Sequence, residues 1–339
     1  MVKDRPKILV VGSFMMDLIS SGKRLPNMGE TVIGAQFQTA PGGKGANQAV
    51  QCARLGASVH MAGCVGDDAF GREMLKALED SGVDVSHVKI TKEHASGVGN
   101  VQIEMKEGSA QNRIMVIPGA NYALAVEDLR WLETEVKDYN LVVMQLELPM
   151  EITEYVAKCA FKAGVPVMLN PAPAAKLSPE LLSQVAYLAP NEHEAALLSE
   201  HSIRVDENGA NKEDLQEVIR ILQNAGAGKV IITLGSNGAV ISKHNVNTDG
   251  FAYQECIKMP EVKDPTAAGD SFIGAFCTGI VYGFSEEAAL AFASYTAALT
   301  VCGMGGIPSL PKLEQVQELL TKRVCRTLSA ERLNLLKTE

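Results

Sequence analysis

The segment Lys7-Ile8-Leu9-Val10-Val11-Gly12 is a short, continuous apolar run that ends in glycine. A run of this length without polar alternation is typical of a strand buried on both faces of a parallel sheet. Asp17 follows soon afterwards, in Ser13-Phe14-Met15-Met16-Asp17. Because open α/β sheets bind ligands at the carboxyl ends of their strands, Asp17 is a candidate ligand contact. The alternative is an ordinary polar residue at a sheet edge.

Strand-like and helix-like segments alternate through the chain beyond this run. Strands are expected at 59–65, 141–145, 165–169, 186–189 and 230–234, and helices at 69–78, 152–163, 179–184, 192–198 and 215–225. This alternation predicts an α/β fold with three layers, α/β/α, and a mostly parallel central sheet. No internal repeat or Pro/Ser-rich linker marks a domain boundary within the 339 residues.

Two stretches interrupt the alternation with mixed polar and apolar residues that lack a helical period. They cover residues 19–40 and 95–118, and the second contains a turn signal at Glu107-Gly108-Ser109. We interpret them as discontinuous parts of a small β-sheet lid, with residues 1–18, 41–94 and 119–339 forming the α/β core. The alternative is a pair of irregular surface insertions. A lid would exclude water from a ligand that is bound beneath it.

The composition excludes several classes of protein. A net charge of −9 disfavours nucleic acid and anionic membrane surfaces as partners. No apolar run reaches the roughly 20 residues that span a bilayer, and no secretory signal is seen. The seven Cys are scattered without C-x-x-C spacing, which indicates free thiols in a reducing cytosol. We therefore expect a cytoplasmic protein.

The segment from Asp264 to Gly274, DPTAAGDSFIG, predicts a turn that leads into a helix. Its small residues Ala267, Ala268 and Gly269 allow a ligand to approach the backbone. Free N–H groups at the helix start, beside its positive dipole end, attract an anion such as a phosphoryl group. Asp270 lies at the same place, either as a helix cap or as a general base for an attacking hydroxyl.

This segment resembles the signature D-T-x-[GA]-A-G-D of the ribokinase family of carbohydrate kinases, also called the PfkB family. A second family signature, G-G-K-G-A-N, occurs at residues 42–47. A glycine-rich turn before a helix otherwise indicates only close packing. The resemblance implies a ribokinase-like fold, with Asp270 as the base and Ala267, Ala268 and Gly269 forming the anion hole. It further implies sugar contacts, which we assign to Met15, Asp17, Gly43, Lys44, Asn47, Glu147 and Asp270.

Three further motifs match the family in order. Asn191 and Glu194 fit its N-x-x-E motif, in which the Glu orders water around Mg²⁺; alone they would be a capping pair. The turn T-L-G-S-N-G, which alone would be a hairpin, faces the nucleotide in the family. The resemblance gives a nucleotide-binding set of Asn191, Thr233, Gly235, Ser236, Gly238, Gly269 and Ser294. It also gives a monovalent cation site, commonly for K⁺, at Asp264, Thr266, Thr300, Gly303, Gly305 and Ser309.

The resemblance covers roughly residues 7–322 and implies ATP-dependent phosphorylation of D-ribose at O5. Two positions depart from the family pattern. Pro265 replaces the usual Thr, which removes an N–H beside the cation loop. Met15 stands where many members have Asn, and a thioether cannot donate a hydrogen bond. Met15 motivates 2-deoxyribose as an alternative substrate. Another sugar or nucleoside kinase of the family is a weaker alternative.

Two hypotheses come from other functional classes. A sugar-sensing regulator could use the same fold, although retention of Asp270 and Glu194 disfavours it. A nicotinamide dehydrogenase is disfavoured because no G-x-G-x-x-G follows the first strand. An exposed edge on the lid sheet would invite pairing with a second copy, so we expect a homodimer through the lid.

Overall fold

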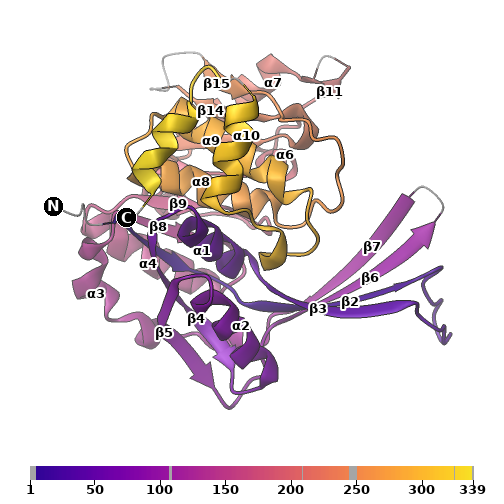
Figure 1. Ribbon diagram of the computed structural model, residues 1–339. Coiled ribbons are helices and arrows are strands. Elements are labelled where there is room, and N and C mark those ends of the chain that lie inside the picture. The colour runs from indigo at the N-terminus through magenta and orange to yellow at the C-terminus, as the bar shows by residue number, and fades with distance from the viewer. Residues whose placement is uncertain (1–4, 107–108, 208, 244–249, 324, 338–339) are drawn as a thin grey trace.

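The computed structural model describes residues 5–106, 109–207, 209–243, 250–323 and 325–337. Within these ranges a central sheet has the order β15-β14-β13-β10-β9-β8-β1-β4-β5 (Figure 1). Its strands are β1 (Lys7–Val11), β4 (Ser58–Gly66), β5 (Val83–Thr91), β8 (Leu141–Met144), β9 (Val167–Leu169), β10 (Tyr187–Leu188), β13 (Lys229–Thr233), β14 (Ala239–Ser242) and β15 (Phe251–Gln254). The seven strands that follow one another in the sheet as β13-β10-β9-β8-β1-β4-β5 run parallel. Strands β14 and β15 add an antiparallel edge. The mostly parallel sheet predicted from the sequence is confirmed.

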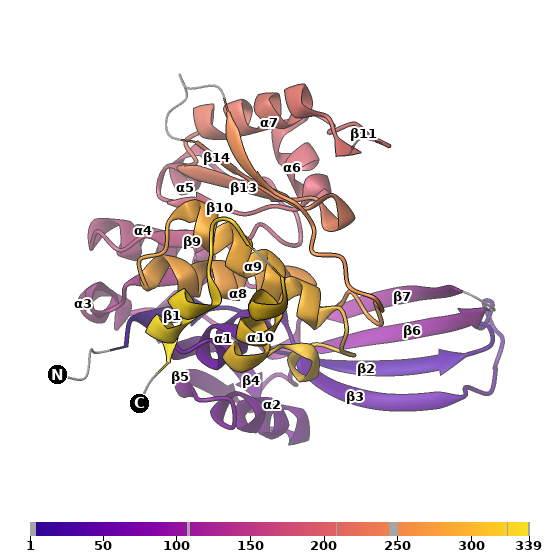
Figure 2. The ribbon, with the colours of Figure 1, turned by 45° about the horizontal axis from the view of Figure 1, so that its top comes forward.

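Helices cover both faces of this sheet (Figure 2). One layer contains α1 (Lys44–Arg54), α2 (Ala69–Glu79), α8 (Ala268–Val281), α9 (Glu286–Thr300) and α10 (Leu313–Lys322). The other contains α3 (Leu132–Glu135), α4 (Met150–Lys162), α5 (Pro179–Ser183), α6 (Glu192–Ser199) and α7 (Lys212–Asn224). On β1, Ile8 and Val10 enter the first core, whereas Leu9 and Val11 enter the second. The continuous apolar run is therefore explained by burial on both sides.

Short 3₁₀ helices complete the connections. They are η1 (Gly119–Ala123), η2 (Val126–Leu129), η3 (Val136–Asp138), η4 (Gly235–Asn237), η5 (Ile307–Ser309) and η6 (Ala330–Leu336). The last of them packs its Leu333 and Leu336 into the first core, beside the end of α1. A Cβ on Gly56 would lie 2.4 Å from the Leu336 carbonyl oxygen, so only glycine permits this approach.

A second, four-stranded sheet projects from the core (Figures 1 and 2). Its order is β3 (Gln36–Gly42), β2 (Met15–Gly22), β6 (Val98–Lys106) and β7 (Ser109–Ile117). The two hairpins β2–β3 and β6–β7 are antiparallel, and β2 pairs in parallel with β6 where they join. Strand β2 begins at Met15, four residues before the predicted start of the lid. Glu107 and Gly108 of the predicted turn lie outside the described residues.

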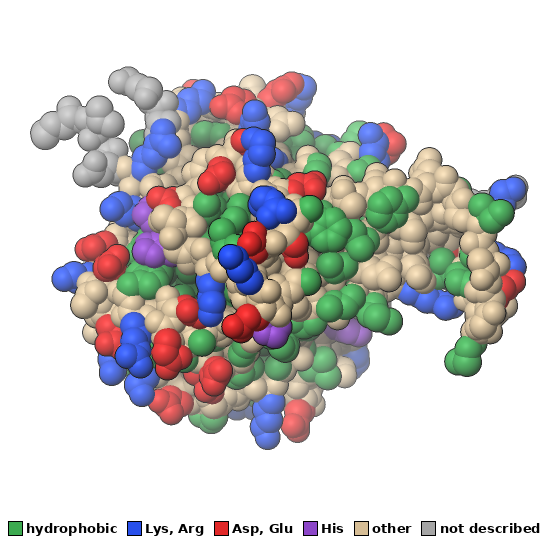
Figure 3. Space-filling model, turned by 90° about the horizontal axis from the view of Figure 1, so that it is seen from below, with side chains coloured by type: hydrophobic (Ala, Val, Ile, Leu, Met, Phe, Trp, Pro, Cys, Tyr) green, Lys and Arg blue, Asp and Glu red, His purple; other side chains and the backbone are tan. Residues whose placement is uncertain are grey.

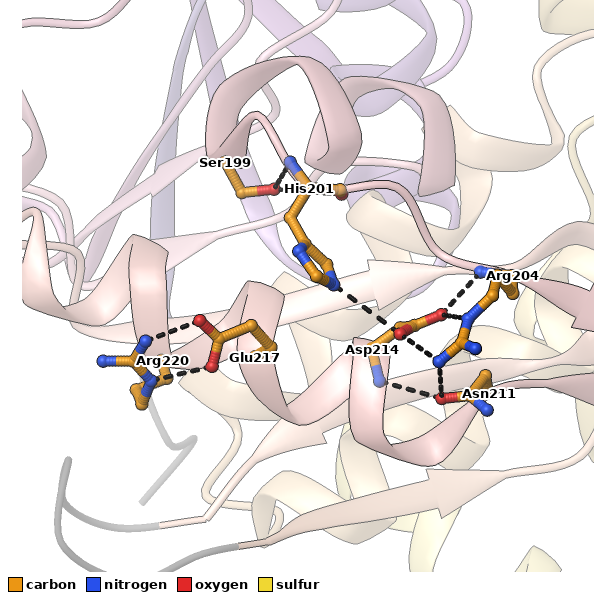
Figure 4. Close-up of polar contacts among 7 residues, drawn as sticks. All are labelled: Ser199, His201, Arg204, Asn211, Asp214, Glu217 and Arg220. Atoms are coloured by element: carbon orange, nitrogen blue, oxygen red, sulfur yellow. Dashed lines mark hydrogen bonds and ion pairs between the residues drawn. The ribbon is translucent and has the colours of Figure 1, made fainter.

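The loop before α7 is fixed by an ion pair (Figure 4). Arg204 donates to both carboxylate oxygens of Asp214, from Nε at 2.7 Å and from Nη2 at 2.8 Å. Asn211 caps α7 by accepting from the Asp214 N–H at 3.0 Å. The small hairpin of β11 (Val205–Asp206) and β12 (Gly209–Ala210) lies within this loop. Arg204 lowers the pKa of Asp214, because the ion pair favours the charged carboxylate.

Candidate active site

Helix α8 begins with free main-chain donors that face open space. Its N-cap, Ala267, has a left-handed φ of 59°. The N–H of Ala268 donates to the Pro265 carbonyl, but those of Gly269 and Asp270 have no hydrogen-bond partner within the described ranges. A Cβ on Gly269 would meet no atom within 4 Å. Two unpaired donors therefore lie at the positive end of the helix dipole, and the open space beside Gly269 can admit an anionic group.

Asp270 is buried beside these donors, and both of its oxygens accept hydrogen bonds from α1. Asn47 Nδ2 lies 2.8 Å from Asp270 Oδ2, and Gln48 Nε2 lies 3.0 Å from Oδ1. Burial raises the pKa of Asp270, whereas the charge of Lys44 and the two amide donors act in the opposite direction. The structure therefore brings together two of the motif residues, Asp270 and Asn47. Gln48 was not predicted, although it follows Asn47 directly in the sequence.

The glycine-rich turn allows α1 to approach the end of β1. Gly43 has a φ of 96°, and a Cβ on Gly45 would lie 2.5 Å from the Ser13 nitrogen. The Lys44 N–H donates to Glu147 Oε2 at 3.1 Å, and the Ser13 hydroxyl donates to the same oxygen. Glu147, after β8, is thus held against the start of α1.

Lys44 lies among four carboxylates. Burial alone would lower the pKa of its ammonium, but Asp270, Glu147, Glu194 and Asp17 raise it above its ordinary value. A permanently charged Lys44 therefore compensates acidic groups that share a partly buried space.

Asp17 is held in β2 between two glycines. A Cβ on Gly99 would lie 2.3 Å from its Oδ1, and one on Gly42 would lie 3.2 Å from its Oδ2. Burial, followed by the charges of Glu147 and Asp264, raises the pKa of Asp17 to about 6. The carboxylate is close to the other acidic residues, and a polar ligand that hydrogen-bonds to it would offset its desolvation.

Met15 is buried at the start of β2. Its Sδ lies 3.8 Å from Nδ2 of Asn121, which also donates to the Phe14 and Pro118 carbonyls. Asn121 was missed in the sequence because a single Asn in the mostly apolar stretch 114–126 carries no periodic signal. The thioether offers an apolar surface in the position where the family pattern places an amide.

The predicted nucleotide motifs meet at the start of α6. Asn191 and Glu194 form a reciprocal capping box, in which each main-chain N–H donates to the other's side chain at 2.8 Å. Burial raises the pKa of Glu194. Asn191 also bridges to Thr233 at the end of β13, which brings the 235–238 turn beside it. Gly235 and Gly238 have φ of 54° and 88°, which explains why glycine occurs there. Ser294 lies in α9, where its hydroxyl donates to the Leu290 carbonyl.

Asp264 links the two loops of the predicted cation site. Its Oδ1 accepts from the N–H and the hydroxyl of Thr266, and its Oδ2 accepts from the Gly305 N–H at 2.8 Å. The hydroxyls of Thr300 and Ser309 donate to the carbonyls of Thr296 and Gly306, which leaves their lone pairs as acceptors. The Gly303 N–H bonds to the Thr300 carbonyl. The predicted set thus offers one carboxylate and several hydroxyl oxygens, which is the ligand type that hard cations prefer.

The structure also bears on membrane-spanning helices and on the state of the cysteines. Across the ranges described above, no helix has the length and apolar composition that crossing a membrane requires. The seven cysteines are free, and three of them, Cys52, Cys64 and Cys277, are buried.

We predict that Asp17→Asn stabilises the unliganded protein in a pH-dependent manner. The folded-state pKa of about 6 lies above the ordinary 3.8, so the native state binds a proton more tightly than the unfolded state. The stabilising contribution of protonated Asp17 is therefore fully present below about pH 4 and is lost as the pH rises through 6. At pH 8 the variant should be about 2–3 kcal/mol more stable, and at pH 4 the difference should nearly vanish.

Urea unfolding at the two pH values measures this effect. Asp214→Asn is the matched control of opposite sign, because Arg204 lowers the pKa of Asp214. It should destabilise by nearly the same amount at pH 8 and pH 4, since this stabilisation is lost only as the pH falls below the ordinary 3.8. An Asp17→Asn variant whose stability change is the same at pH 4 and pH 8 would contradict the prediction.

Comparisons with known proteins agree with this geometry. Residues 5–313 match the model of the pfkB family carbohydrate kinases. A ribokinase of Schizosaccharomyces pombe is 42% identical over 316 residues, which cover 91% of this chain and 96% of the relative. A deoxyribokinase of Salmonella typhi is 33% identical over 315 residues, which cover 93% and 98%.

The solved structures agree as well. The structure of Arabidopsis thaliana ribokinase complexed with ribose and ATP superposes with a TM-score of 0.83 at 32% identity, and the match covers 93% of this chain and 98% of that one. The family match over residues 5–313 includes the projecting sheet and every motif discussed above. The predicted family is confirmed, and the chain belongs to the pfkB family of carbohydrate kinases.

Proposed function

We propose that this kinase transfers the γ-phosphoryl group of ATP to O5 of D-ribose. The observation that carries the proposal is the position of the buried Asp270 carboxylate, which lies at the same helix start as the free N–H groups of Gly269 and Asp270. The similarity to a ribokinase and to a ribokinase structure with ribose and ATP supports this substrate pair.

In this mechanism Asp270 accepts the proton of the 5-hydroxyl as the oxygen attacks the γ-phosphorus. The O5–P bond forms, the bond from the γ-phosphorus to the β,γ-bridging oxygen breaks, and ADP leaves. The N–H groups of Gly269 and Asp270 stabilise charge on the transferred phosphoryl oxygens. Most of the rate enhancement would come from positioning and electrostatics, because phosphoryl transfer requires little covalent chemistry from the protein.

The remaining candidates divide into sugar, nucleotide and ion contacts. Asp17, Asn47, Glu147 and Lys44 supply the acceptors and donors that vicinal hydroxyls require. The turn at Thr233–Gly238, with Asn191, would face the nucleotide. Glu194 would hold Mg²⁺ through water, and a magnesium ion held there would supply positive charge to the phosphates of the nucleotide. The Asp264 loops would hold K⁺. The free cysteines suit a reducing compartment, which supports a cytoplasmic location.

We predict that Asp270→Ala lowers kcat by at least about 10²–10⁴-fold, because the hydroxyl loses its proton acceptor. ATP binding should change little, because the variant keeps the main-chain N–H groups at the helix start and every side chain of the nucleotide motifs. Coupled ADP release and calorimetric ATP titration measure the two quantities. The control is Asp80→Ala, which removes an exposed carboxylate paired with Lys76 and should leave turnover unchanged. Ordinary turnover in Asp270→Ala would remove the proposed base.

Met15 favours a second candidate substrate, 2-deoxyribose. A site without a group that bonds to a hydroxyl discriminates weakly against the sugar that lacks it. We expect kcat/KM values for ribose and deoxyribose within about tenfold of each other, and a ribose preference that rises about 5–30-fold in Met15→Asn. Met15→Leu is the matched apolar control and should leave the ratio unchanged. A ribose preference of about 10³-fold or more in the natural chain would dispose of this candidate.

We assign residues 19–40 and 95–118 to a lid and propose that it mediates a homodimer. Apolar side chains on the projecting sheet are exposed, as Figure 3 shows over the arm. On β7, Ile114 is 58% and Met115 is 66% exposed, although they point to opposite faces. Partner strands or faces from a second copy would cover such a surface.

Sedimentation should therefore show a dimer at micromolar concentration. Ile114 and Val116 share one face of β7, and Met115 and Ile117 share the other. Glutamate at both positions of the face that the second copy covers should produce monomers. Glutamate at both positions of the opposite face should leave the dimer intact. A natural chain that sediments only as a monomer would refute the proposal.

A further inference from the structure

A series of side-chain amides lies behind Asp270, on the side away from the helix start. Gln48 Nε2, which donates to Asp270, also donates to Asn170 Oδ1 at 3.2 Å. Gln145 Nε2 donates to Gln48 Oε1 at 2.6 Å. Asn170 Nδ2 donates to the Ala189 carbonyl at 2.9 Å. The series links α1 to the ends of β8, β9 and β10.

The series has one consistent orientation. A main-chain carbonyl only accepts, so Ala189 fixes the NH₂ group of Asn170 on its own side and turns Oδ1 toward Gln48. The NH₂ group of Gln48 must then face both Asn170 and Asp270, which uses both of its hydrogens. Its Oε1 is left to accept from Gln145. The orientation of the donor to Asp270 is therefore determined by residues that do not touch Asp270.

Gln48 is too deeply buried to contact a substrate. Its exposed fraction is 0%, and that of Gln145 is 1%. Gly12 makes room for this packing, because a Cβ there would lie 2.2 Å from Gln145 Oε1. Asn47, the other donor to Asp270, belongs to the motif expected to bind sugar, whereas Gln48 can act only through Asp270.

We propose that Gln48 is a positioning residue for the catalytic carboxylate, and that Gln145 and Asn170 hold its amide so that it always donates to Asp270. This inference rests on the proposed function, in which Asp270 is the base. It explains why a polar series is buried at the α1–sheet junction, where apolar residues would otherwise pack.

The test uses the pH dependence of the base. The charged groups that face Asp270 are Lys44 from α1, Glu147 after β8, Asp17 from β2 and Glu194 from α6. None of them is altered when Gln48 is replaced. Removing one donor from an anion disfavours the charged form, so Asp270 should protonate at higher pH.

In Gln48→Met, the acid limb of kcat/KM should move up by about one pH unit, so that kcat/KM falls about tenfold at pH values on this limb, with little change in the sugar KM. Gln145→Met should shift the limb in the same direction by less, because the Gln48 amide can then rotate. The matched control is Gln51→Met. Gln51 lies one turn later on α1, is equally buried and donates to the Pro311 carbonyl, away from Asp270. It should alter stability without moving the limb.

Gln48→Glu is the second variant, in case the Met variant fails to fold. It keeps the shape but places a carboxyl group beside Asp270, so the acid limb should move further than in Gln48→Met. A limb that stays in place in folded Gln48→Met or Gln48→Glu, or that moves equally in Gln51→Met, would overturn the proposal.

A substrate-free readout separates this proposal from the proposed function. The Asp270 carboxyl carbon can be followed by NMR in protein labelled with ¹³C-Asp and assigned with Asp270→Asn. A titration that moves in Gln48→Met but not in Gln51→Met supports the positioning role even if ribose is not phosphorylated. Absence of ribose turnover in the natural chain would refute only the proposed substrate.

Discussion

A buried carboxylate at the junction of two helices is the constraint on which the site depends. Asp270 is removed from water, so its charge must be compensated by the protein. Among the residues that the structure describes, α1 supplies this compensation, through hydrogen bonds from Asn47 and Gln48 and through the nearby ammonium of Lys44. For this reason α1 must lie close to both α8 and β1, and Gly45 permits the second approach. The glycines of the motif are thus linked to the chemistry through packing.

The same reasoning applies to the surrounding acidic groups. The charges of Glu147, Asp264 and Asp270 repel that of Asp17, and Lys44 is the cation that interacts with Asp17, Glu147, Glu194 and Asp270. An unliganded site of this kind costs stability, and a polyol that hydrogen-bonds to the carboxylates would relieve part of the cost. Residues that are suited to bind a ligand therefore lower the stability of the unliganded protein in this part of the chain. The ion pair of Asp214 with Arg204, far along the chain on α7, illustrates the stabilising kind.

Most of the fold could be predicted because the parallel strands are continuous apolar runs and the helices have a clear period. The predicted segments at 7–12, 59–65 and 141–145 correspond to β1, β4 and β8. Strand β5 was missed, since it lies at the sheet edge and its residues alternate in burial. Within the site, the family resemblance assigned both Asn47 and Asp270 to the sugar, but it did not predict the hydrogen bond between them. Gln48, Gln145 and Asn121 could not be predicted, because their role depends on which elements pack together, and local sequence does not specify that packing.

The contact between Asn47 and Asp270 joins residues that are 223 positions apart. Contacts of such sequence separation form late, since much of the intervening chain must order before they hold. The hydrogen bonds to Asp270 therefore form only when α1, from the N-terminal part of the chain, has packed against α8, from the C-terminal part. Partly folded chains in which these two parts have not packed together should lack a working base. Recovery of catalysis during renaturation therefore reports that the whole domain has folded.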